Sequence, residues 1–280
     1  MTTSVEPVLS VLVVARNAAD TIGAQLDALL AQSFDAPWEL VVVDDGSSDA
    51  TAALVDARAA AAPWVRRVGG PGRGVAAARN TALAAARAPH LAMVDADDVV
   101  APGWLAAMAV ALDEAPLVAG ALEIDRLNPE WVRGTRGRAL TRGPGSFGGV
   151  LPFAHSCNLG IRRDLVDRIG PFDETIEAGE DVEFSYRAGR LGVEPLYAPD
   201  AVVHYRYRTS LRALWRQGRS YGRVRSVLGR RFAAEGLVLP APSRARAGLG
   251  LLRRLPTWAT RAGRANWVFA AAGLVGAARP

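Results

Sequence analysis

Nearly continuous apolar runs that alternate with helix-forming segments most strongly constrain how this chain can fold. Three such runs are SVLVVA (10–15), WELVVV (38–43) and LAMV (91–94). Runs without regular polar interruption are typical of strands buried on both faces of a sheet. Helical spacing lies around and between them, at residues 20–32, 51–61 and 75–86. This alternation predicts an α/β fold with a mostly parallel central sheet flanked by helices.

Acidic residues follow two of these runs directly. Asp44 and Asp45 end the second run, and Asp95, Asp97 and Asp98 (DADD) follow the third. Because ligands of parallel sheets bind beyond the carboxyl ends of the strands, we expect both clusters at one edge. Oxygen ligands suit a hard cation such as Mg²⁺ or Mn²⁺, with one aspartate on the metal and another on a ribose hydroxyl. The structural alternatives are a turn at Asp44-Asp45 and helix capping by Asp97 or Asp98.

Three further features are candidates for binding or catalysis. The loop GGPGRG precedes the helix at 75–86, and Arg73 and Arg79 could pair there with a diphosphate or form surface ion pairs. Glu180-Asp181 starts another predicted helix, where Asp181 could cap the helix or accept a proton from an attacking hydroxyl. His204 ends a predicted strand at 196–204 and is a candidate third metal ligand, although a structural role is the alternative.

Several function classes are excluded by what the sequence lacks. All 33 Lys and Arg residues are arginine, which counts strongly against receiver domains and haloacid-dehalogenase-type phosphatases, since both need a lysine. A Walker A loop would require Gly-Lys-Ser/Thr, and the Rossmann glycine pattern does not follow the first strand. The single cysteine, Cys157, excludes an internal disulfide and indicates a reducing compartment.

The motifs occur together in one order over about residues 8 to 208. This order resembles that of an inverting glycosyltransferase of family 2 with the GT-A fold. The stretches that carry the resemblance are SVLVVARNAADTI, ELVVVDDGSSDAT, GRGVAAARNTAL, DADD, SCNLGIRRDLVDRIGPFDETIEAGEDVEFSYRAGRLG and VVHYRYR. The resemblance implies metal-dependent transfer of a sugar, with inversion, from a nucleoside-diphosphate donor to an acceptor hydroxyl.

The resemblance also implies where the donor binds. Ala15 and Arg16 would flank the nucleobase, Asp45 would read it with Asp44 beside it, and Arg73 would lie near the diphosphate. Arg79 and Asp95 complete the predicted donor-binding set. Arg16-Asn17 stands where the family commonly has Tyr-Asn, so guanidinium stacking would replace an aromatic ring. A UDP-, GDP- or dTDP-linked donor is therefore compatible with the sequence.

The remaining site residues follow from the same resemblance. Asp97 and Asp98 would bind Mg²⁺ or Mn²⁺, with His204 completing the metal site as in some members. Asp181 would be the general base with Glu180 beside it. Cys157 and Asn158 would line the acceptor side, where a glycan or lipid-linked acceptor of the cell envelope is expected. Separately, the glycine content of the loop at 126–149 suggests that it closes over the donor and excludes water.

The C-terminal part of the chain is strongly basic. After Tyr205 there are 16 arginines and one acid, Glu235. We expect residues 1–208 to form the catalytic domain and 209–280 a basic helical region that meets an anionic membrane surface. The apolar stretch at 265–278 is too short for a confident membrane span. It predicts either an interfacial helix, with nearby arginines on lipid phosphates, or a helix packed on the body; these arginines are Arg253, Arg254, Arg261 and Arg264.

The expected location is cytoplasmic, on or near the inner face of the plasma membrane. The start of the chain, MTTSVEPVLS, has neither a basic region nor an apolar core of signal-peptide length. Nucleic acid is not an expected partner, since no recognised module accompanies the basic charge. Two other functions stay open: a sugar-nucleotide nucleotidyltransferase, and a non-catalytic membrane-docked protein that binds nucleotide sugars. The product released would distinguish all three.

Overall fold

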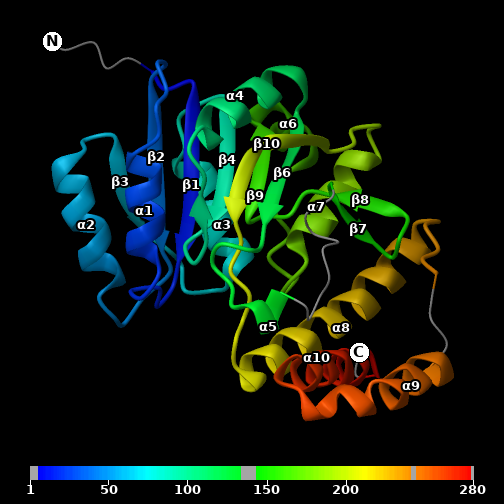
Figure 1. Cartoon of the computed structure of the whole chain (residues 1–280). Coiled ribbons are helices and arrows are strands. Elements are labelled where there is room, and N and C mark those ends of the chain that lie inside the picture. The colour runs from blue at the N-terminus through cyan, green and yellow to red at the C-terminus, as the bar shows by residue number, and fades with distance from the viewer. Residues whose placement is uncertain (1–5, 134–142, 241–243, 279–280) are drawn as a thin grey trace, which may run out of the picture. The chain divides into compact units, whose positions relative to one another are not determined.

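The computed structural model describes residues 6–133, 143–240 and 244–278 (Figure 1). These residues divide into two compact units. The first holds the described residues up to 123 together with 143–145 and 152–205. The second holds 124–133, 146–151 and the described residues from 206 onward. All the residues predicted for the site belong to the first unit.

An eight-stranded sheet forms the centre of the first unit, in the order β3-β2-β1-β4-β9-β6-β10-β5. Strands β1 to β4 run parallel to one another, and β6 runs parallel to β10, whereas β9 and β5 are antiparallel to the strands beside them. The mostly parallel sheet that the apolar runs predict is thereby confirmed. Its strands are β1 (Leu9–Ala15), β2 (Trp38–Asp44), β3 (Val65–Gly69), β4 (His90–Asp95), β5 (Val99–Val100), β6 (Leu117–Glu123), β9 (Asn158–Arg162) and β10 (Leu196–His204).

Helices cover both faces of this sheet (Figure 1). Helices α1 (Ile22–Leu30), α2 (Thr51–Ala61) and α4 (Trp104–Glu114) pack on one face. Helices α3 (Val75–Ala85), α6 (Arg163–Ile169) and α7 (Glu180–Gly189) pack on the other. The helices predicted at 20–32, 51–61 and 75–86 are present, with ends that differ by at most two residues.

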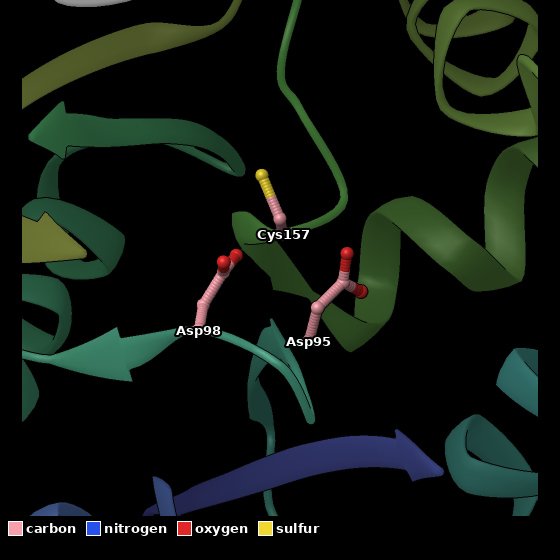
Figure 2. A group of neighbouring side chains, drawn as sticks. All are labelled: Asp95, Asp98 and Cys157. Carbon is pink, nitrogen blue, oxygen red and sulfur yellow. The ribbon is translucent and has the colours of Figure 1, made fainter. Parts of the chain in front are cut away.

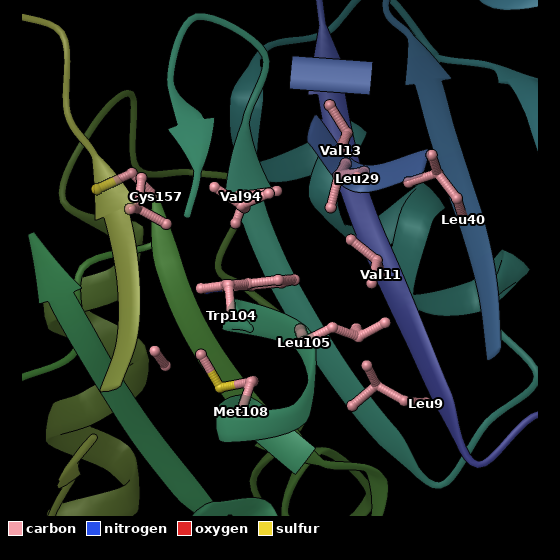
Figure 3. Packing of buried hydrophobic residues seen from close by; sticks show 14 of the residues in the cluster. Leu9, Val11, Val13, Leu29, Leu40, Val94, Trp104, Leu105, Met108 and Cys157 are labelled. Atoms are coloured by element: carbon pink, nitrogen blue, oxygen red, sulfur yellow. The ribbon is translucent and has the colours of Figure 1, made fainter. Parts of the chain in front are cut away.

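Strand β1 shows why an uninterrupted apolar run is needed here. Leu9, Val11 and Val13 join the first core with Trp104 of α4 (Figure 3). Leu12, between them, belongs to the core on the opposite face. Alternate residues of a strand point to opposite faces, so both sets must be apolar when helices cover both.

The register of the strands brings the acidic clusters to one edge. Asp44 pairs with Ala15, and Asp95 pairs with Val14 on the other side of β1. The two acidic strand ends therefore flank the end of the same strand. This confirms the expectation that both clusters open on one edge of the sheet.

The second unit is largely helical. Glycines allow α8 (Leu211–Ala234) and α10 (Arg261–Ala278) to pack closely. A Cβ on Gly222 would lie 2.0 Å from the Gly273 carbonyl oxygen, and one on Gly276 would lie 2.0 Å from the Arg219 carbonyl oxygen. The stretch predicted as either an interfacial or a packed helix thus packs on α8. The helices of the second unit are α5 (Glu130–Arg133), α8 (Leu211–Ala234), α9 (Arg244–Arg253), the 3-10 helix η2 (Leu255–Ala259) and α10 (Arg261–Ala278).

The segment predicted as a loop at 126–149 contains short regular elements. It includes α5 and the strand β7 (Gly145–Phe147), which pairs with β8 (Leu151–Phe153). Residues 134–142 lie outside the described residues, so closure of this segment over a donor stays a prediction. Among the described helices, none has the length and apolar character needed to cross a membrane.

Candidate functional site

The turn between β4 and β5 presents the DADD residues at the sheet edge. Gln25 of α1 is fully buried and binds the backbone at both ends of this turn. Its Nε2 donates to the Asp95 carbonyl oxygen at 3.0 Å, and its Oε1 accepts from the Val100 amide at 3.0 Å. One side chain therefore fixes the span of the acidic turn. The sequence reasoning did not identify Gln25.

Asp95, Asp98 and Cys157 form the cluster best placed to hold a cation. Each offers a ligand atom, and these atoms lie within 4.8 Å of one another (Figure 2). Burial, followed by the nearby Asp98 and Asp95 carboxylates, raises the pKa of the Cys157 thiol well above its ordinary value. A neutral thiol is a poor ligand for a hard cation, whereas carboxylate oxygens are suitable ligands. Asp97 and His204, both predicted as ligands, are not members of this cluster.

Arg79 of α3 connects the acidic turn with the start of α7. Its buried guanidinium donates through Nη2 to Asp95 Oδ1 at 3.1 Å and through Nη1 to Glu180 Oε1. Buried carboxylates need such a partner, because an isolated buried charge is strongly unfavourable. Arg79 therefore holds two motifs together that lie far apart in the sequence. Its predicted contact with a diphosphate stays a prediction.

The first turn of α7 carries the candidate base Asp181. The helix begins after Gly179, which adopts a left-handed conformation with φ 83°. Asp181 Oδ2 accepts from the Ser156 amide at 3.1 Å, and Oδ1 accepts from the Val182 amide at 2.8 Å. Each oxygen retains a second lone pair, so the carboxylate can still accept a proton. The bond to Ser156 places Asp181 beside the segment predicted to line the acceptor side.

That segment, residues 155–158, is mostly buried. Burial lowers the pKa of His155, while the nearby Asp181 opposes the shift. Asn158 joins three elements: its Nδ2 donates to the carbonyl oxygens of Ala121 and Ala201, both at 2.8 Å, and its Oδ1 accepts from Trp104 Nε1 at 2.8 Å. These bonds give Asn158 a structural role. Acceptor contacts by Cys157 and Asn158 stay predictions.

Asp45, the predicted base-reading residue, is rigidly held at the end of β2. Its amide donates to the Ala15 carbonyl oxygen at 2.8 Å, and its Oδ1 accepts from the Gly72 amide at 2.7 Å. Its Oδ2 lies 3.6 Å from Nη1 of Arg16, whose side chain is 55% exposed. The loop GGPGRG thus supports Asp45 through a backbone amide. Arg16 remains accessible beside it, where guanidinium stacking on a base is predicted.

Asp44 and Arg73 have other partners in the structure. Asp44 Oδ1 accepts from the Ser47 amide at 3.1 Å, which is the turn interaction considered as its alternative. Arg73 is exposed and pairs through Nη1 with Glu174 Oε2 at 3.3 Å. An exposed ion pair of this kind contributes little, so a stronger anionic ligand can displace it. Their donor contacts stay predictions.

His204 ends β10 and lies next to the acidic turn. Its backbone pairs with Val99, the residue after Asp98. Its Nδ1 lies 2.6 Å from Oε2 of Glu123, the last residue of β6. In carboxylate–histidine–metal arrangements, such a contact orients the ring so that the other nitrogen binds the metal. Glu123 was not identified from the sequence.

Comparisons with known proteins agree with this architecture. Residues 10–170 match the model of the family described as Glycosyl transferase family 2. The chain is 32% identical over 210 residues to the succinoglycan biosynthesis protein ExoO of Rhizobium meliloti (strain 1021), covering 68% of this chain and 59% of that protein. A shorter match, 36% identical over 103 residues, is to the UDP-Glc:alpha-D-GlcNAc-diphosphoundecaprenol beta-1,3-glucosyltransferase WfgD of Escherichia coli, covering 35% of this chain and 36% of WfgD.

A solved structure extends the similarity over nearly the whole chain. The mannosyltransferase PcManGT from Pyrobaculum calidifontis, in complex with GDP-Man and Mn²⁺, has a TM-score of 0.66 and 21% identity, covering 99% of this chain and 88% of that one. At this identity the match supports the GT-A fold alone. The chain spans only 59% of the length of ExoO, whereas the family model covers more than half of the 280 residues here. The chain therefore belongs to glycosyltransferase family 2.

Proposed function

We propose that this chain is a metal-dependent inverting glycosyltransferase that moves a sugar from a nucleoside-diphosphate donor to an acceptor hydroxyl. The observation that carries the proposal is the bridge made by the buried Arg79, which holds the partly exposed Asp95 of the acidic turn and the buried Glu180 beside Asp181. It joins the predicted donor end of the site to the predicted base. Asp45 lies at the same sheet edge, because the ends of β2 and β4 both flank the end of β1.

The donor would bind with its base against Asp45 and Arg16. Asp45 Oδ1 is already bonded to the Gly72 amide, so the carboxylate is held in place before a base N–H or ribose hydroxyl arrives. Arg73 would leave Glu174 and pair with the diphosphate, since guanidinium and phosphate form strong charge-assisted bonds. The base itself is not determined by these residues. UDP-, GDP- and dTDP-linked donors are all candidates.

The side chains of the acidic turn fit a divalent cation. Asp95 and Asp98 supply hard oxygen ligands near one another, and we propose that they hold Mg²⁺ or Mn²⁺ with Asp97 in the same turn. His204, oriented by Glu123, would complete the site through Nε2. When bound, such a cation neutralises charge on the diphosphate leaving group. The similar mannosyltransferase structure contains Mn²⁺, which supports this assignment.

Asp181 would act as the general base. The acceptor hydroxyl gives its proton to the carboxylate while its oxygen forms a bond to the anomeric carbon. The bond between that carbon and the diphosphate oxygen breaks, and the nucleoside diphosphate leaves with the bonding electrons. A single displacement from the opposite face inverts the anomeric configuration. Ser156 holds one carboxylate oxygen through its amide and so orients the base.

The acceptor would be a glycan or a lipid-linked sugar of the cell envelope. The names of ExoO and WfgD, which refer to succinoglycan biosynthesis and to a diphosphoundecaprenol acceptor, support this class. We further propose that residues 1–208 form the catalytic domain and that 209–280 form a basic helical region that meets the membrane surface. The expected location is the cytoplasm, at the inner face of the plasma membrane.

The first test combines donor binding with product analysis. UDP-, GDP- and dTDP-sugars are screened by thermal shift with and without Mn²⁺, on the wild type and on Asp98→Ala. Asp181→Asn then separates binding from chemistry, because it should keep the metal-dependent shift and lose turnover by at least about a hundredfold. Asp167→Ala, an exposed aspartate on α6, is the matched control and should behave as the wild type.

Each outcome distinguishes a function. Release of nucleoside diphosphate that requires Asp181 supports the glycosyltransferase. Release of pyrophosphate would instead identify a nucleotidyltransferase. Donor binding without any turnover, tested with membrane extracts as acceptor, would identify a binding protein. No metal-dependent shift in folded protein would mean that the acidic turn has a structural role alone.

A further inference from the structure

The segment from α9 into η2 exposes large apolar side chains. Every residue from 252 to 261 is exposed. Residues three apart are neighbours on a helix surface, so the pair on α9 and the pair on η2 each form a local apolar strip. The four side chains and their exposed fractions are Leu249 48%, Leu252 62%, Leu255 47% and Trp258 40%. Exposed apolar strips of this kind indicate an interaction surface.

Positive charge lies within the same segment. Arg253 and Arg254 are exposed and stand directly between Leu252 and Leu255. Residues 236–280 contain seven arginines and no aspartate or glutamate. The surface therefore has no acidic residue from its own part of the sequence to balance it. A partner that is both apolar and negatively charged would complement it.

The neighbouring helix α10 cannot supply the same surface. Its Ala272, Gly273 and Gly276 pack against α8, and Ala271, Ala272 and Gly276 are buried. No described helix is apolar enough over sufficient length to span a bilayer. Contact with a membrane would therefore involve lying on its surface, which suits basic amphipathic segments with leucine and tryptophan on the apolar side.

We propose that Leu249, Leu252, Arg253, Arg254, Leu255 and Trp258 form a docking surface for an anionic lipid bilayer. The leucines and Trp258 would enter the boundary between headgroups and acyl chains, while the arginines contact lipid phosphates. Nucleic acid would use the arginines but leave three leucines exposed to water, so it explains less of the surface. The proposal does not depend on the glycosyltransferase reaction, because the docking surface contains none of its proposed site residues.

Vesicle co-sedimentation of the full chain tests the proposal without any nucleotide sugar. The vesicles are phosphatidylcholine alone, or phosphatidylcholine and phosphatidylglycerol in equal parts, each at low and high salt. The wild type should bind the anionic vesicles and lose binding as salt rises. Leu252→Asp and the pair Arg253→Gln with Arg254→Gln should each weaken that binding by roughly tenfold or more.

Leu191→Asp is the matched control, since Leu191 is also exposed, at 48%, and lies in the first unit. It makes the same chemical change and should bind as the wild type. Circular dichroism melts establish that each variant is folded. Equal binding by all variants, or no binding of the wild type to anionic vesicles, would overturn the proposal. Binding to a duplex oligonucleotide but not to vesicles would overturn it in favour of nucleic acid.

Discussion

Gly70 offers the sharpest test of how the GGPGRG loop supports Asp45. A Cβ at Gly70 would lie 2.7 Å from Asp45 Oδ1, 2.8 Å from Asp45 Cα and 3.1 Å from Val43 Cγ1. One of these is a backbone atom, so no rotamer change alone relieves the clash. At the adjacent Gly69, a Cβ would meet nothing within 4 Å, and its φ is outside the positive range. Gly70→Ala and Gly69→Ala are therefore the same chemical change with and without a clash against Asp45 and Val43.

The expected magnitude follows from overpacking a tight site. Forcing one extra carbon into a packed position costs about 1–3 kcal/mol. The shift would also strain the 2.7 Å bond from the Gly72 amide to Asp45. Gly69→Ala should instead be neutral or stabilise by up to ~1 kcal/mol, because it restricts the unfolded chain. A difference of about 2 kcal/mol corresponds to roughly 4–8 °C in melting temperature.

Two measurements check this expectation. Thermal melts compare the two alanine variants, and calorimetric titration compares their affinity for the donor found in the thermal-shift screen. Gly70→Ala should melt lower and bind the donor at least about tenfold more weakly, since Asp45 would be displaced. Equal melting temperatures would refute the steric argument. A lower melting temperature with unchanged donor affinity would refute the placement of the nucleotide on Asp45.

Three further predictions concern other parts of the chain. Burial raises the pKa of Glu39, but hydrogen bonds from Arg66 and Ser10 outweigh this effect, so the pKa lies below the ordinary 4.5. The ionised Glu39 therefore stabilises the folded state above pH 4.5, and this contribution is lost as the pH falls through the folded pKa. Glu39→Gln should therefore lower the free energy of unfolding by about 2 kcal/mol at neutral pH. Urea titrations should find that the difference in this free energy between wild type and variant becomes smaller below pH 4.5. Gly222→Ala should lower the melting temperature, because the new Cβ would lie 2.0 Å from a carbonyl oxygen. Gly273→Ala is the control, because the nearest atom to its Cβ would be 3.7 Å away. Equal melting temperatures of the two variants would contradict close packing of α8 and α10. Since burial raises the pKa of Cys157, its thiol should react with iodoacetamide far more slowly in native protein than in urea, and equal rates would rule out the buried position.

The elements that could be predicted from sequence are those that local pattern determines. The run at 11–15 is apolar at every position that faces either helical layer, which is the pattern of a doubly covered strand. Asp44 and Asp95 end their strands where the apolar pattern stops. Once the sheet is parallel, adjacent strand ends must meet. The position of both acidic clusters at one edge thus followed from sequence and was confirmed by the register.

The residues that could not be predicted act over long sequence separations. Gln25 is separated from Asp95 by 70 positions, and Arg79 from Glu180 by 101. Gln25 did leave one signal, because it is a polar residue on the face of α1 that otherwise buries Ile22, Leu26 and Leu29. A polar side chain at such a position needs a buried partner. Which partner it finds depends on tertiary structure, so the pattern predicts a bond without naming it.

The charges around Arg79 indicate that the divalent cation should bind before the nucleotide-sugar donor. Asp95 and Glu180 share one guanidinium, so the bridge itself carries an excess negative charge. A diphosphate that entered such a site alone would add negative charge close to Asp95, and like charges at short range repel one another. A divalent cation on Asp95 and Asp98 would reverse the local sign before the diphosphate arrives. Donor affinity should therefore fall by at least about tenfold when Mn²⁺ is replaced by EDTA. If titrations find equal affinity in both buffers, Arg73 suffices for the diphosphate and the acidic turn does not bind the metal.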